Sequence, residues 1–571
     1  MRWFRKTPHI YELELDHILA DSTNKPAFNT GRLEGRLEAP LSERSIYAVG
    51  GGFVLIATVF LYQLFQLQVV RGDEFRARSE TNRLDTNIIF AERGAIVDRT
   101  GEPLAWNIEA EDGAAFSKRA YSTRRGISPV VGYLSYPKKD KSGFYFRTEY
   151  IGRGGVEESY DTQLEGKNGE QLLEVDARGE KVSGHIVHDP VPGTSLELSI
   201  DAALSEALYD QIATTTIARG FRSGAAAIMD VETGEIIAMA SYPSFDANVM
   251  LLGTDEAQIK AWHEDTRLPF LNKLISGLYT PGSIVKPFMA LAALRDNTVS
   301  PLTSFFSSGK LTIPNPYSPD KPSVFTDWKA HGSVDMRRAI AVSSNIYFYI
   351  IGGGFEGQKG IGITRMHDFF EHYGVNQKTG IDLPGEVTGI VPNPEWKQEA
   401  FDDDWRLGDT YLTSIGQFGF QTTPLSMLRA YAAIANGGIL LTPTIIKADT
   451  PLGTTTNLEL PAEHRRVILE GMRQGAIEGT ARTLNRKDVM IAAKTGTAEL
   501  GATKAYVNSW VTGFYPYEKP KYAFIFLMEH GPRANLFGSS PAFAQFLNWM
   551  AINKPEYLTT IASSTAPENQ Q

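Results

Sequence analysis

The pattern of apolar and polar positions sets one long uncharged segment near the N-terminus apart from the shorter apolar runs that follow. From Ile46 to Val70 no residue is charged, and a helix needs only about 20 apolar residues to cross the hydrocarbon core of a bilayer. The segment is too long for the apolar part of a signal peptide, and no small-residue cleavage site follows it. We therefore predict an uncleaved transmembrane helix at 45–70, preceded by a cytoplasmic tail at 1–44.

The region after the anchor, residues 71–215, consists of short segments separated by glycine and polar turns. This punctuation is typical of a β-rich and irregular module. We expect it to form an elongated pedestal domain with the character of a dimerisation domain.

A larger α+β domain is predicted over residues 216–552. Two apolar runs around Glu232-Thr233-Gly234 indicate a β-hairpin at its start. A helix is predicted at 422–438, where Pro424 stands at the first helical position and Gly437 follows the end. Three sheet strands and a covering helix are expected at 492–500, 507–516, 521–530 and 541–551. The fold class is thus a central antiparallel sheet flanked by helices, followed by a disordered tail at 553–571.

Composition narrows the possible partners and chemistry. The 571 residues suffice for two or three domains. The formal net charge is −10 and no basic block stands out, which argues against nucleic acid as a partner. The chain contains no cysteine, so disulfides, thiol catalysis and thiolate zinc sites are all excluded.

The segment "LYTPGSIVKPFMALAAL" (278–294) places a serine and a lysine at the start of a helix that is apolar on all sides. Residues i and i+3 share a helix face, so the Ser283 hydroxyl and the Lys286 ammonium are expected to touch. The free N–H groups of the first turn point at whatever approaches. This is the geometry of an activated nucleophile. A serine that only caps the helix, followed by a lysine that extends to solvent, would give the same sequence pattern.

Two further short motifs occur later in the same domain. Ser343-Ser344-Asn345 lies in "RRAIAVSSNIYFYI", and Lys494-Thr495-Gly496-Thr497 lies on the first of the late strands. Taken separately, the first could be a simple helix cap and the second a turn. The three motifs in this order match the set found in β-lactamases and penicillin-binding proteins.

The chemistry explains why these residue types belong together. Lys286 can act as the base for Ser283 only when it is neutral, and burial together with the charge of Lys494 would lower its pKa. Ser343 can pass the proton to the leaving amine, and Asn345 can hold the substrate amide. Lys494, Thr495 and Thr497 offer a charge and hydroxyls to a terminal carboxylate, and Gly496 lets the substrate lie close to the strand. The backbone N–H groups of Ser283 and Thr497 would form the oxyanion hole.

From about residue 60 to 550 the chain resembles the class B penicillin-binding proteins, and within them penicillin-binding protein 2. The resemblance is carried by the three motifs and by several longer segments: "LQVVRGDEFRARSETNR", "ERGAIVDRTGEPLA", "GGVEESYDTQLEGKNG", "AAAIMDVETGEIIAMASYPSFDAN" and "NPEWKQEAF…WRLGDTYLTSIGQFGFQTTPLSM". It implies a membrane-anchored peptidoglycan D,D-transpeptidase of cell-wall elongation. Ser283 would form an acyl-enzyme with a stem peptide ending in D-Ala-D-Ala, and β-lactams would trap it.

The resemblance also implies partners and topology. Such enzymes pair with a SEDS-family glycosyltransferase in the membrane through the span and the pedestal. Arginines lie on both sides of the span, so flanking charge does not orient it. Because murein lies outside the cytoplasmic membrane, the resemblance places the N-terminus in the cytoplasm and the catalytic domain outside.

Two departures limit the resemblance. Some family members carry a zinc site that includes a cysteine, and this chain has no cysteine. His367 and His372 are five residues apart, which does not match the H-E-x-x-H spacing, so no metal and no cofactor are expected. The tail before the span is also longer than the family leads us to expect.

Four other functions remain open. A division transpeptidase of the penicillin-binding protein 3 type is the nearest, and a β-lactamase or related sensor would share the three motifs. A D,D-carboxypeptidase would let water resolve the acyl group, and a scaffold would serve mainly to activate the glycosyltransferase.

Overall fold

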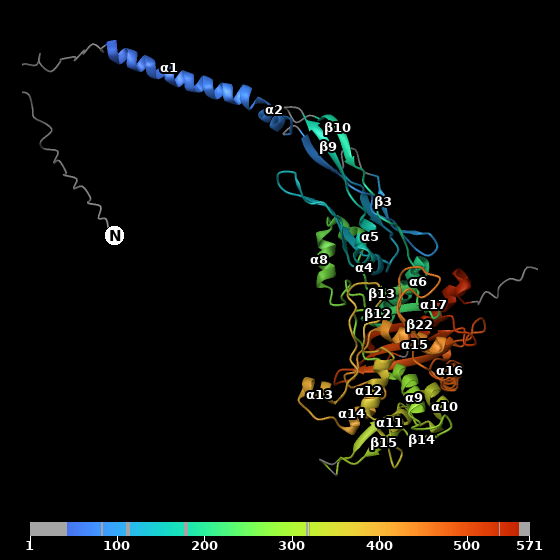
Figure 1. The fold of residues 1–571 in the computed structure, drawn as a ribbon. Coiled ribbons are helices and arrows are strands. Elements are labelled where there is room, and N and C mark those ends of the chain that lie inside the picture. Colours follow the sequence, from blue (N-terminus) through green and yellow to red (C-terminus); the bar gives the residue numbers. More distant parts are fainter. Residues whose placement is uncertain are drawn as a thin grey trace, which may run out of the picture. The chain divides into compact units, whose positions relative to one another are not determined.

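The computed structural model describes residues 43–81, 84–109, 115–175, 181–315, 318, 320–535 and 537–558. Nearly all of the predicted cytoplasmic tail and most of the predicted C-terminal tail lie outside these residues. The chain divides into two compact units, Met1–Asp85 with Leu173–Gly184, and Thr86–Leu172 with His185–Gln571. Figure 1 gives the element labels.

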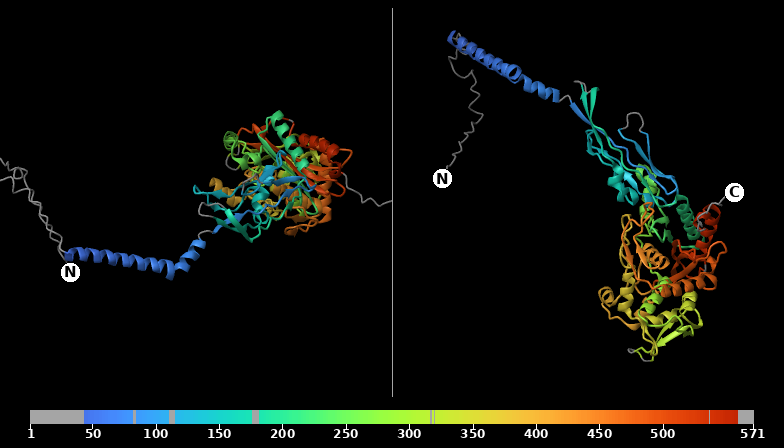
Figure 2. Two further views of the ribbon diagram at one scale, coloured as in Figure 1. Left: turned by 90° about the horizontal axis from the view of Figure 1, so that it is seen from above. Right: turned by 45° about the vertical axis from the view of Figure 1, so that its right-hand side comes forward.

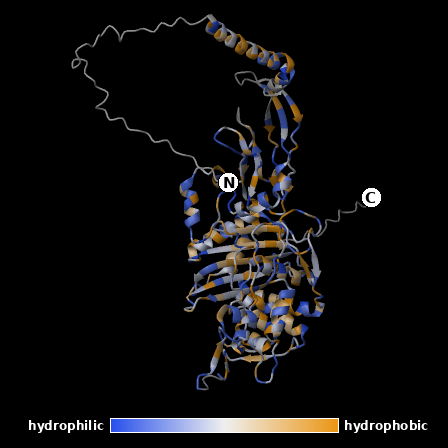
Figure 3. Ribbon diagram, turned by 60° about the vertical axis from the view of Figure 1, so that its left-hand side comes forward, coloured by the Kyte–Doolittle hydropathy of each residue, from blue (hydrophilic) through white to orange (hydrophobic). Residues whose placement is uncertain are grey.

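The apolar segment of the first unit is helical throughout. α1 (Glu43–Phe65) continues without a break into a π-helical turn, η4 (Gln66–Val70), and α2 (Gly72–Thr81) follows. Within the described part of the chain, Ile46–Val70 is the single helical stretch that is long and apolar enough to cross a membrane. Figure 3 shows apolar residues recurring along it. The helix predicted there is therefore present, with its last turn wound as a π-helix.

Short strands dominate the region predicted as a pedestal. A four-stranded sheet has the order β11-β2-β3-β4, and a three-stranded sheet has the order β1-β9-β10. The strands are β1 (Leu84–Ile89), β2 (Ile96–Val97), β3 (Pro103–Ile108), β4 (Lys118–Tyr121), β5 (Tyr133–Ser135), β6 (Lys138–Lys139), β7 (Tyr145–Arg147), β8 (Ile151–Arg153), β9 (Gly169–Val175), β10 (Lys181–His188) and β11 (Leu196–Glu197). Three short helices that the sequence did not predict accompany them: α3 (Ser128–Val131), α4 (Gly155–Ser159) and α5 (Asp161–Glu165).

A buried cluster of ion pairs lies within this β-rich region. Glu157 accepts hydrogen bonds from the Nε atoms of Arg93 (2.7 Å) and Arg119 (2.9 Å), and all three residues are less than 5% exposed. Arg93 also donates a hydrogen bond to the Asp161 carboxylate, at 2.6 Å. Arg93 and Glu157 come from two of the segments that carry the family resemblance, so those segments meet in a charge-paired core.

The second large region is built on a five-stranded antiparallel sheet in the order β13-β12-β22-β21-β20. Its strands are β12 (Ser223–Asp230), β13 (Ile236–Tyr242), β20 (Ala492–Leu500), β21 (Tyr506–Tyr515) and β22 (Tyr522–Pro532). The N-terminal hairpin thus pairs with the last strand of the chain, and β20 forms one edge. The predicted strands lie within two residues of these bounds.

Helices cover both faces of the sheet, because its strands are apolar on both sides. α6 (Ala202–Arg219) and α17 (Ser539–Asn553) pack on one face, around a core that includes Phe524 and Phe543. α15 (Pro424–Asn436) and α16 (Ala462–Ile477) cover the other face, as the views in Figures 1 and 2 show. The predicted helix at 422–438 is α15, whose N-cap is Thr423. The predicted α+β layering is confirmed.

The remaining elements lie mostly between β13 and α15 and bring the motif residues to one edge of the sheet. The helices are α7 (Ala247–Leu252), α8 (Glu256–Glu264), α9 (Lys286–Arg295), α10 (Met336–Val342), α11 (Asn345–Gly353), α12 (Ile363–His372), α13 (Pro394–Phe401) and α14 (Leu407–Thr413), with 3₁₀ turns η5 (Gly282–Val285), η6 (Arg482–Leu484) and η7 (Pro555–Tyr557). The strands are β14 (Phe305–Ser307), β15 (Lys310–Ile313), β16 (Ser323–Thr326), β17 (Gly332–Val334), β18 (Ile439–Leu441) and β19 (Thr455–Asn457).

Candidate active site

Ser283 lies on the 3₁₀ turn η5, directly before α9. The turn is fixed at both ends, because Gly282 N–H donates to the Gly416 carbonyl (2.9 Å) and the Tyr431 hydroxyl donates to the Ile284 carbonyl (2.6 Å). Gly282 has a φ of +58°, and a Cβ there would lie 3.1 Å from the Thr497 carbonyl oxygen. A glycine before the serine therefore lets the turn pack against β20, while Ser283 itself stays partly exposed.

The Ser343-Ser344-Asn345 motif is a sharp turn between two helices. Ser343 ends α10 in the left-handed conformation, with a φ of +59°. Ser344 caps the start of α11, where its hydroxyl accepts the Tyr347 N–H at 3.4 Å, and Asn345 begins that helix. The motif is a helix cap, and this geometry also turns the side chains of Ser343 and Asn345 toward Lys286.

Lys286 is fully buried and is held by this turn. Its Nζ donates to the Ser343 carbonyl (2.8 Å), to Ser343 Oγ (3.2 Å) and to Asn345 Oδ1 (2.7 Å). The expected contact with the Ser283 hydroxyl is not among these three hydrogen bonds. Burial lowers the pKa of Lys286 to about 7, although the charge of Asp327 opposes the change. An amine with this pKa is available as a base at neutral pH.

Lys494 approaches Ser343 from the other side. It is buried on β20, and its Nζ donates to Ser343 Oγ (2.8 Å) and to the Thr495 carbonyl (2.7 Å). Burial, and next the charge of Lys286, hold the pKa of Lys494 well below its usual range. The Ser343 oxygen therefore lies between two lysine amines, which suits a hydroxyl that relays a proton.

Thr495, Gly496 and Thr497 follow on the same edge strand. The Thr495 hydroxyl donates to Thr480 Oγ1 (2.6 Å), and Thr497 is exposed. A Cβ on Gly496 would lie 2.9 Å from the Pro281 carbonyl oxygen. The sequence suggested that this glycine makes room for substrate. The structure shows that the space beside it is occupied by the turn that carries Ser283.

One residue of the site was missed by sequence reasoning. The Asp327 side chain is fully buried beside the Ser343 turn, where its Oδ2 accepts the Ser344 hydroxyl at 2.8 Å. It lies in a mostly exposed polar stretch after β16, with no motif around it. Nothing in its sequence neighbourhood separates it from an ordinary loop aspartate.

The described residues contain one group of three side chains that could hold a metal ion. His367, Asp368 and Glu371 lie within 4.8 Å of one another on α12, and the two carboxylates are exposed. These residues and the three catalytic motifs lie on different elements. A zinc site with a cysteine ligand does not fit this chain, because it contains no cysteine.

Comparisons with known proteins agree with this geometry. Residues 224–548 match the family described as "Penicillin binding protein transpeptidase domain", and residues 114–198 match "Penicillin-binding Protein dimerisation domain". The chain belongs to the class B penicillin-binding proteins. The family predicted from the sequence is therefore confirmed, and both matched regions lie within the expected pedestal and catalytic domains.

Similar proteins point to one branch of this penicillin-binding protein family. "Peptidoglycan D,D-transpeptidase MrdA" of Acinetobacter baumannii is 32% identical over 458 residues, which cover 74% of this chain and 65% of that protein. "Peptidoglycan D,D-transpeptidase FtsI" of Escherichia coli is 25% identical over 584 residues, 90% of this chain and 93% of that protein. The branch named MrdA is thus the more similar of the two.

Two solved structures share the fold at similar identity. The Helicobacter pylori protein in "Complex between Penicillin-Binding Protein (PBP2) and MreC" is 25% identical, with a TM-score of 0.69 over 83% of this chain and 100% of that one. A chain from "Structural coordination of polymerization and crosslinking by a peptidoglycan synthase complex" is 27% identical, with a TM-score of 0.68 over 88% of this chain and 97% of that one.

Proposed function

We propose that this protein is a serine-type peptidoglycan D,D-transpeptidase of cell-wall elongation. The observation that carries the proposal is the arrangement of two buried lysine amines around the Ser343 hydroxyl. One of these lysines, Lys286, follows Ser283 by three residues, and its backbone N–H donates to the Ser283 carbonyl. Its membership of the class B penicillin-binding proteins and its similarity to proteins named MrdA supply the reaction class.

Acylation begins at Ser283. Its Oγ attacks the carbonyl carbon of the D-Ala-D-Ala bond, and neutral Lys286 takes the hydroxyl proton. The backbone N–H groups of Ser283 and Thr497 stabilise the oxyanion. When the C–N bond breaks, the leaving D-Ala amine receives a proton through Ser343, and an acyl ester on Ser283 remains.

Transfer then reverses these roles. The amine of a neighbouring stem peptide attacks the ester carbon and loses a proton through the same relay, and Ser283 Oγ leaves and regains its hydrogen. Asn345 holds the substrate amide, and Lys494, Thr495 and Thr497 bind the terminal carboxylate. A β-lactam enters the first step as a substrate mimic, and its ring-opened acyl group stays on Ser283.

The anchor and the relatives support a location and partners. Ile46–Val70 would fix the chain in the cytoplasmic membrane with the N-terminus inside and the catalytic domain outside, where murein lies. A similar chain was solved within a peptidoglycan synthase complex and another with MreC. A membrane glycosyltransferase of the SEDS family is the partner we propose for this chain.

The first experiment is intact mass of the detergent-solubilised full chain after incubation with benzylpenicillin, beside Ser283→Ala. We expect one stable adduct on the native chain and none on the variant. No adduct on the native chain would leave only a scaffold role. An adduct that disappears as the drug is consumed would indicate a β-lactamase.

A second assay separates transpeptidase from carboxypeptidase. The native chain is supplied with a pentapeptide stem, with and without a free stem amine as acceptor. Crosslinked product in the presence of the acceptor supports the proposal. Release of D-Ala with the tetrapeptide alone as product would indicate a D,D-carboxypeptidase.

A further inference from the structure

The Asp327 carboxylate forms hydrogen bonds to the turn that carries Ser343 and Asn345. Its Oδ2 accepts three hydrogen bonds, from the Ser344 hydroxyl (2.8 Å), the Ile346 N–H (3.2 Å) and the Ser307 hydroxyl (3.2 Å). Its Oδ1 accepts the Trp328 N–H at 2.9 Å. The first two donors flank Asn345, so one carboxylate fixes the start of α11 from both sides.

The same loop holds the catalytic turn at two more points. Asn345 Nδ2 donates to the Thr326 carbonyl (3.2 Å), and Trp328 Nε1 donates to the Val342 carbonyl (3.1 Å). The two neighbours of Asp327 in the chain, Thr326 and Trp328, thus form hydrogen bonds to residues at the two ends of the turn. The carboxylate is the central element of this contact.

Asp327 also carries a negative charge in a site that is otherwise cationic. On β20, the charge of Lys494 acts on Lys286. On α11, the Asn345 amide accepts from Lys286 and the Phe348 ring lies 5.5 Å from Lys286 Nζ. Tyr349, also on α11, interacts with Asp327, and burial together with the charge of Asp327 raises the pKa of that phenol. His331 Nε2 lies 3.5 Å from Asp327 Oδ1, and Lys329 lies on the same loop. Burial lowers the pKa of His331, so this ring is neutral at neutral pH.

The charge on Asp327 is maintained despite its burial. Burial alone would raise the pKa of this carboxyl, but hydrogen bonding to the Asn345 N–H and the charge of Lys286 outweigh that effect and lower it. The charge of Asp327 in turn raises the pKa of Lys286 against the effect of burial. The two groups are therefore electrostatically coupled.

We propose that Asp327 is a positioning residue for acylation, which holds the turn that carries Ser343 and Asn345 and supplies the negative charge opposite Lys286. This inference rests on the proposed function, because it assigns Asp327 a role in preparing Lys286 as the base. A carboxylate at this position keeps Lys286 basic enough to take a proton from Ser283. Without the charge, Lys286 would be neutral over a wider pH range but would be a weaker base.

The test is the pH dependence of acylation by benzylpenicillin for the full chain and for Asp327→Asn, which keeps the shape and removes the charge. On the acidic side of the plot of acylation rate against pH, which we call the acidic limb, we expect the midpoint for the variant to lie about one pH unit lower than for the native chain. We also expect the plateau rate to fall about tenfold, since a weaker base transfers the proton less well.

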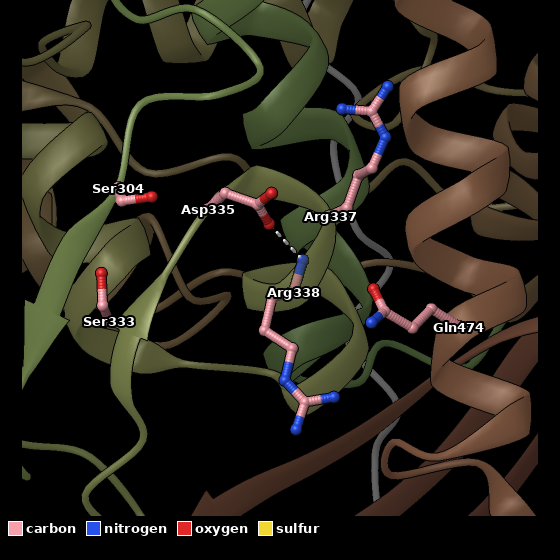
Figure 4. A pocket seen from close by; sticks show the side chains of 6 residues that line it. All are labelled: Ser304, Ser333, Asp335, Arg337, Arg338 and Gln474. Carbon is pink, nitrogen blue, oxygen red and sulfur yellow. Dashed lines mark hydrogen bonds between the residues drawn. The ribbon is translucent and has the colours of Figure 1, made fainter.

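Two matched variants separate charge from mere structure. Ser344→Ala removes a hydrogen bond of the same turn without changing charge, so it should lower the plateau and leave the limb in place. Asp335→Asn removes a carboxylate from the opposite end of α10, where Asp335 accepts the Arg338 N–H at 2.8 Å beside a polar hollow lined by Ser304, Ser333, Asp335, Arg337, Arg338 and Gln474 (Figure 4). Both the plateau and the limb should stay as in the native chain.

The outcomes distinguish this inference from the proposed function. If the native chain forms no adduct, the proposed function fails, and with it the role of Asp327 as proposed. If the native chain is acylated but the acidic limb of Asp327→Asn coincides with that of Ser344→Ala, the carboxylate is only structural and the inference is overturned. A limb that moves to higher pH would also overturn it.

Discussion

Two of the buried clusters of charged side chains among the described residues differ in how their positive charges are paired. In the β-rich region, Arg93 and Arg119 share the carboxylate of Glu157, and Arg93 also binds Asp161. In the catalytic region, Lys286 and Lys494 are equally buried, but their hydrogen bonds go to a hydroxyl, an amide and carbonyl groups.

The difference shows what pairing does to a buried cation. The pKa of Arg93 is lowered by burial, but its two carboxylate partners more than compensate and the net shift is upward. Lys286 has one carboxylate acting on it at a distance, and its pKa falls to about 7. Paired cations stay charged and hold the fold together, whereas poorly paired cations become available for proton transfer.

The largest effect should come from removing the base. Lys286→Met is expected to slow acylation by benzylpenicillin by at least about 10³-fold, because Ser283 loses its proton acceptor. Stopped-flow or quenched mass measurements of adduct formation check this. A loss of less than about tenfold would mean that another group activates Ser283.

The same variant should also be more stable at pH 6. A buried amine with a lowered pKa costs free energy when it is protonated, so its replacement is expected to raise the free energy of unfolding by about 2 kcal/mol. Urea unfolding monitored by circular dichroism measures the difference. A destabilised Lys286→Met would show that its three hydrogen bonds outweigh the cost of burial.

In the β-rich cluster the corresponding change should have the opposite sign. Glu157→Gln leaves two buried guanidinium groups without their shared charge, and breaking a buried pair in this way costs about 3–5 kcal/mol. We expect a lower unfolding midpoint and an unchanged acylation rate for the folded fraction. An unchanged midpoint would mean that the cluster contributes no net stability.

The pH dependence of stability sharpens the comparison further. The pKa of Lys286 is about 7 in the folded chain and about 10.4 in the unfolded chain, so between these values the unfolded chain binds more protons. The free energy of unfolding should therefore rise with pH above about 7 and be insensitive to this group below it. The advantage of Lys286→Met over the native chain should shrink by about 2 kcal/mol between pH 7 and pH 9.

The smallest effect is expected for charges that remain in solvent. Glu499 pairs with Lys504 and Arg533, both at 2.8 Å, and the two cations are more than half exposed. Exposed pairs contribute about 0–1 kcal/mol. Glu499→Gln should leave the unfolding midpoint nearly unchanged, and it serves as the reference for the two buried clusters.

The sequence predicted the elements better than the contacts between them. Cap residues and apolar runs placed α15 and the last three strands within two residues, because these signals are local. The order of the three motifs also grouped Ser283, Lys286, Ser343, Asn345 and Lys494 as one set, and their roles remain proposals. The contact between Ser283 and Lys286 stays a prediction. The hydrogen bonds from Lys286 to Ser343 and Asn345 were not predicted, because they depend on the three-dimensional turn.

What the sequence could not supply depended on long-range packing. The Arg93–Glu157 pair joins residues far apart in the chain, and Asp327 is buried only because its loop folds over the Ser343 turn. Gly496 has the residue type that was expected, but its neighbour is the Ser283 turn. The predicted domain bounds at 71–215 and 216–552 stay predictions, as do the two tails.

The position of β20 at the edge of the sheet has a consequence for inhibition. Proteins usually cover or charge such an edge, because its free N–H and C=O groups invite other extended chains to add to the sheet. Here the edge has to stay accessible if an extended stem peptide is to reach Ser283. A rigid strand mimic could exploit that requirement by pairing with the backbone of Thr495 to Thr497. Its binding would need no reactive ring and no serine nucleophile, so Ser283→Ala would not weaken it.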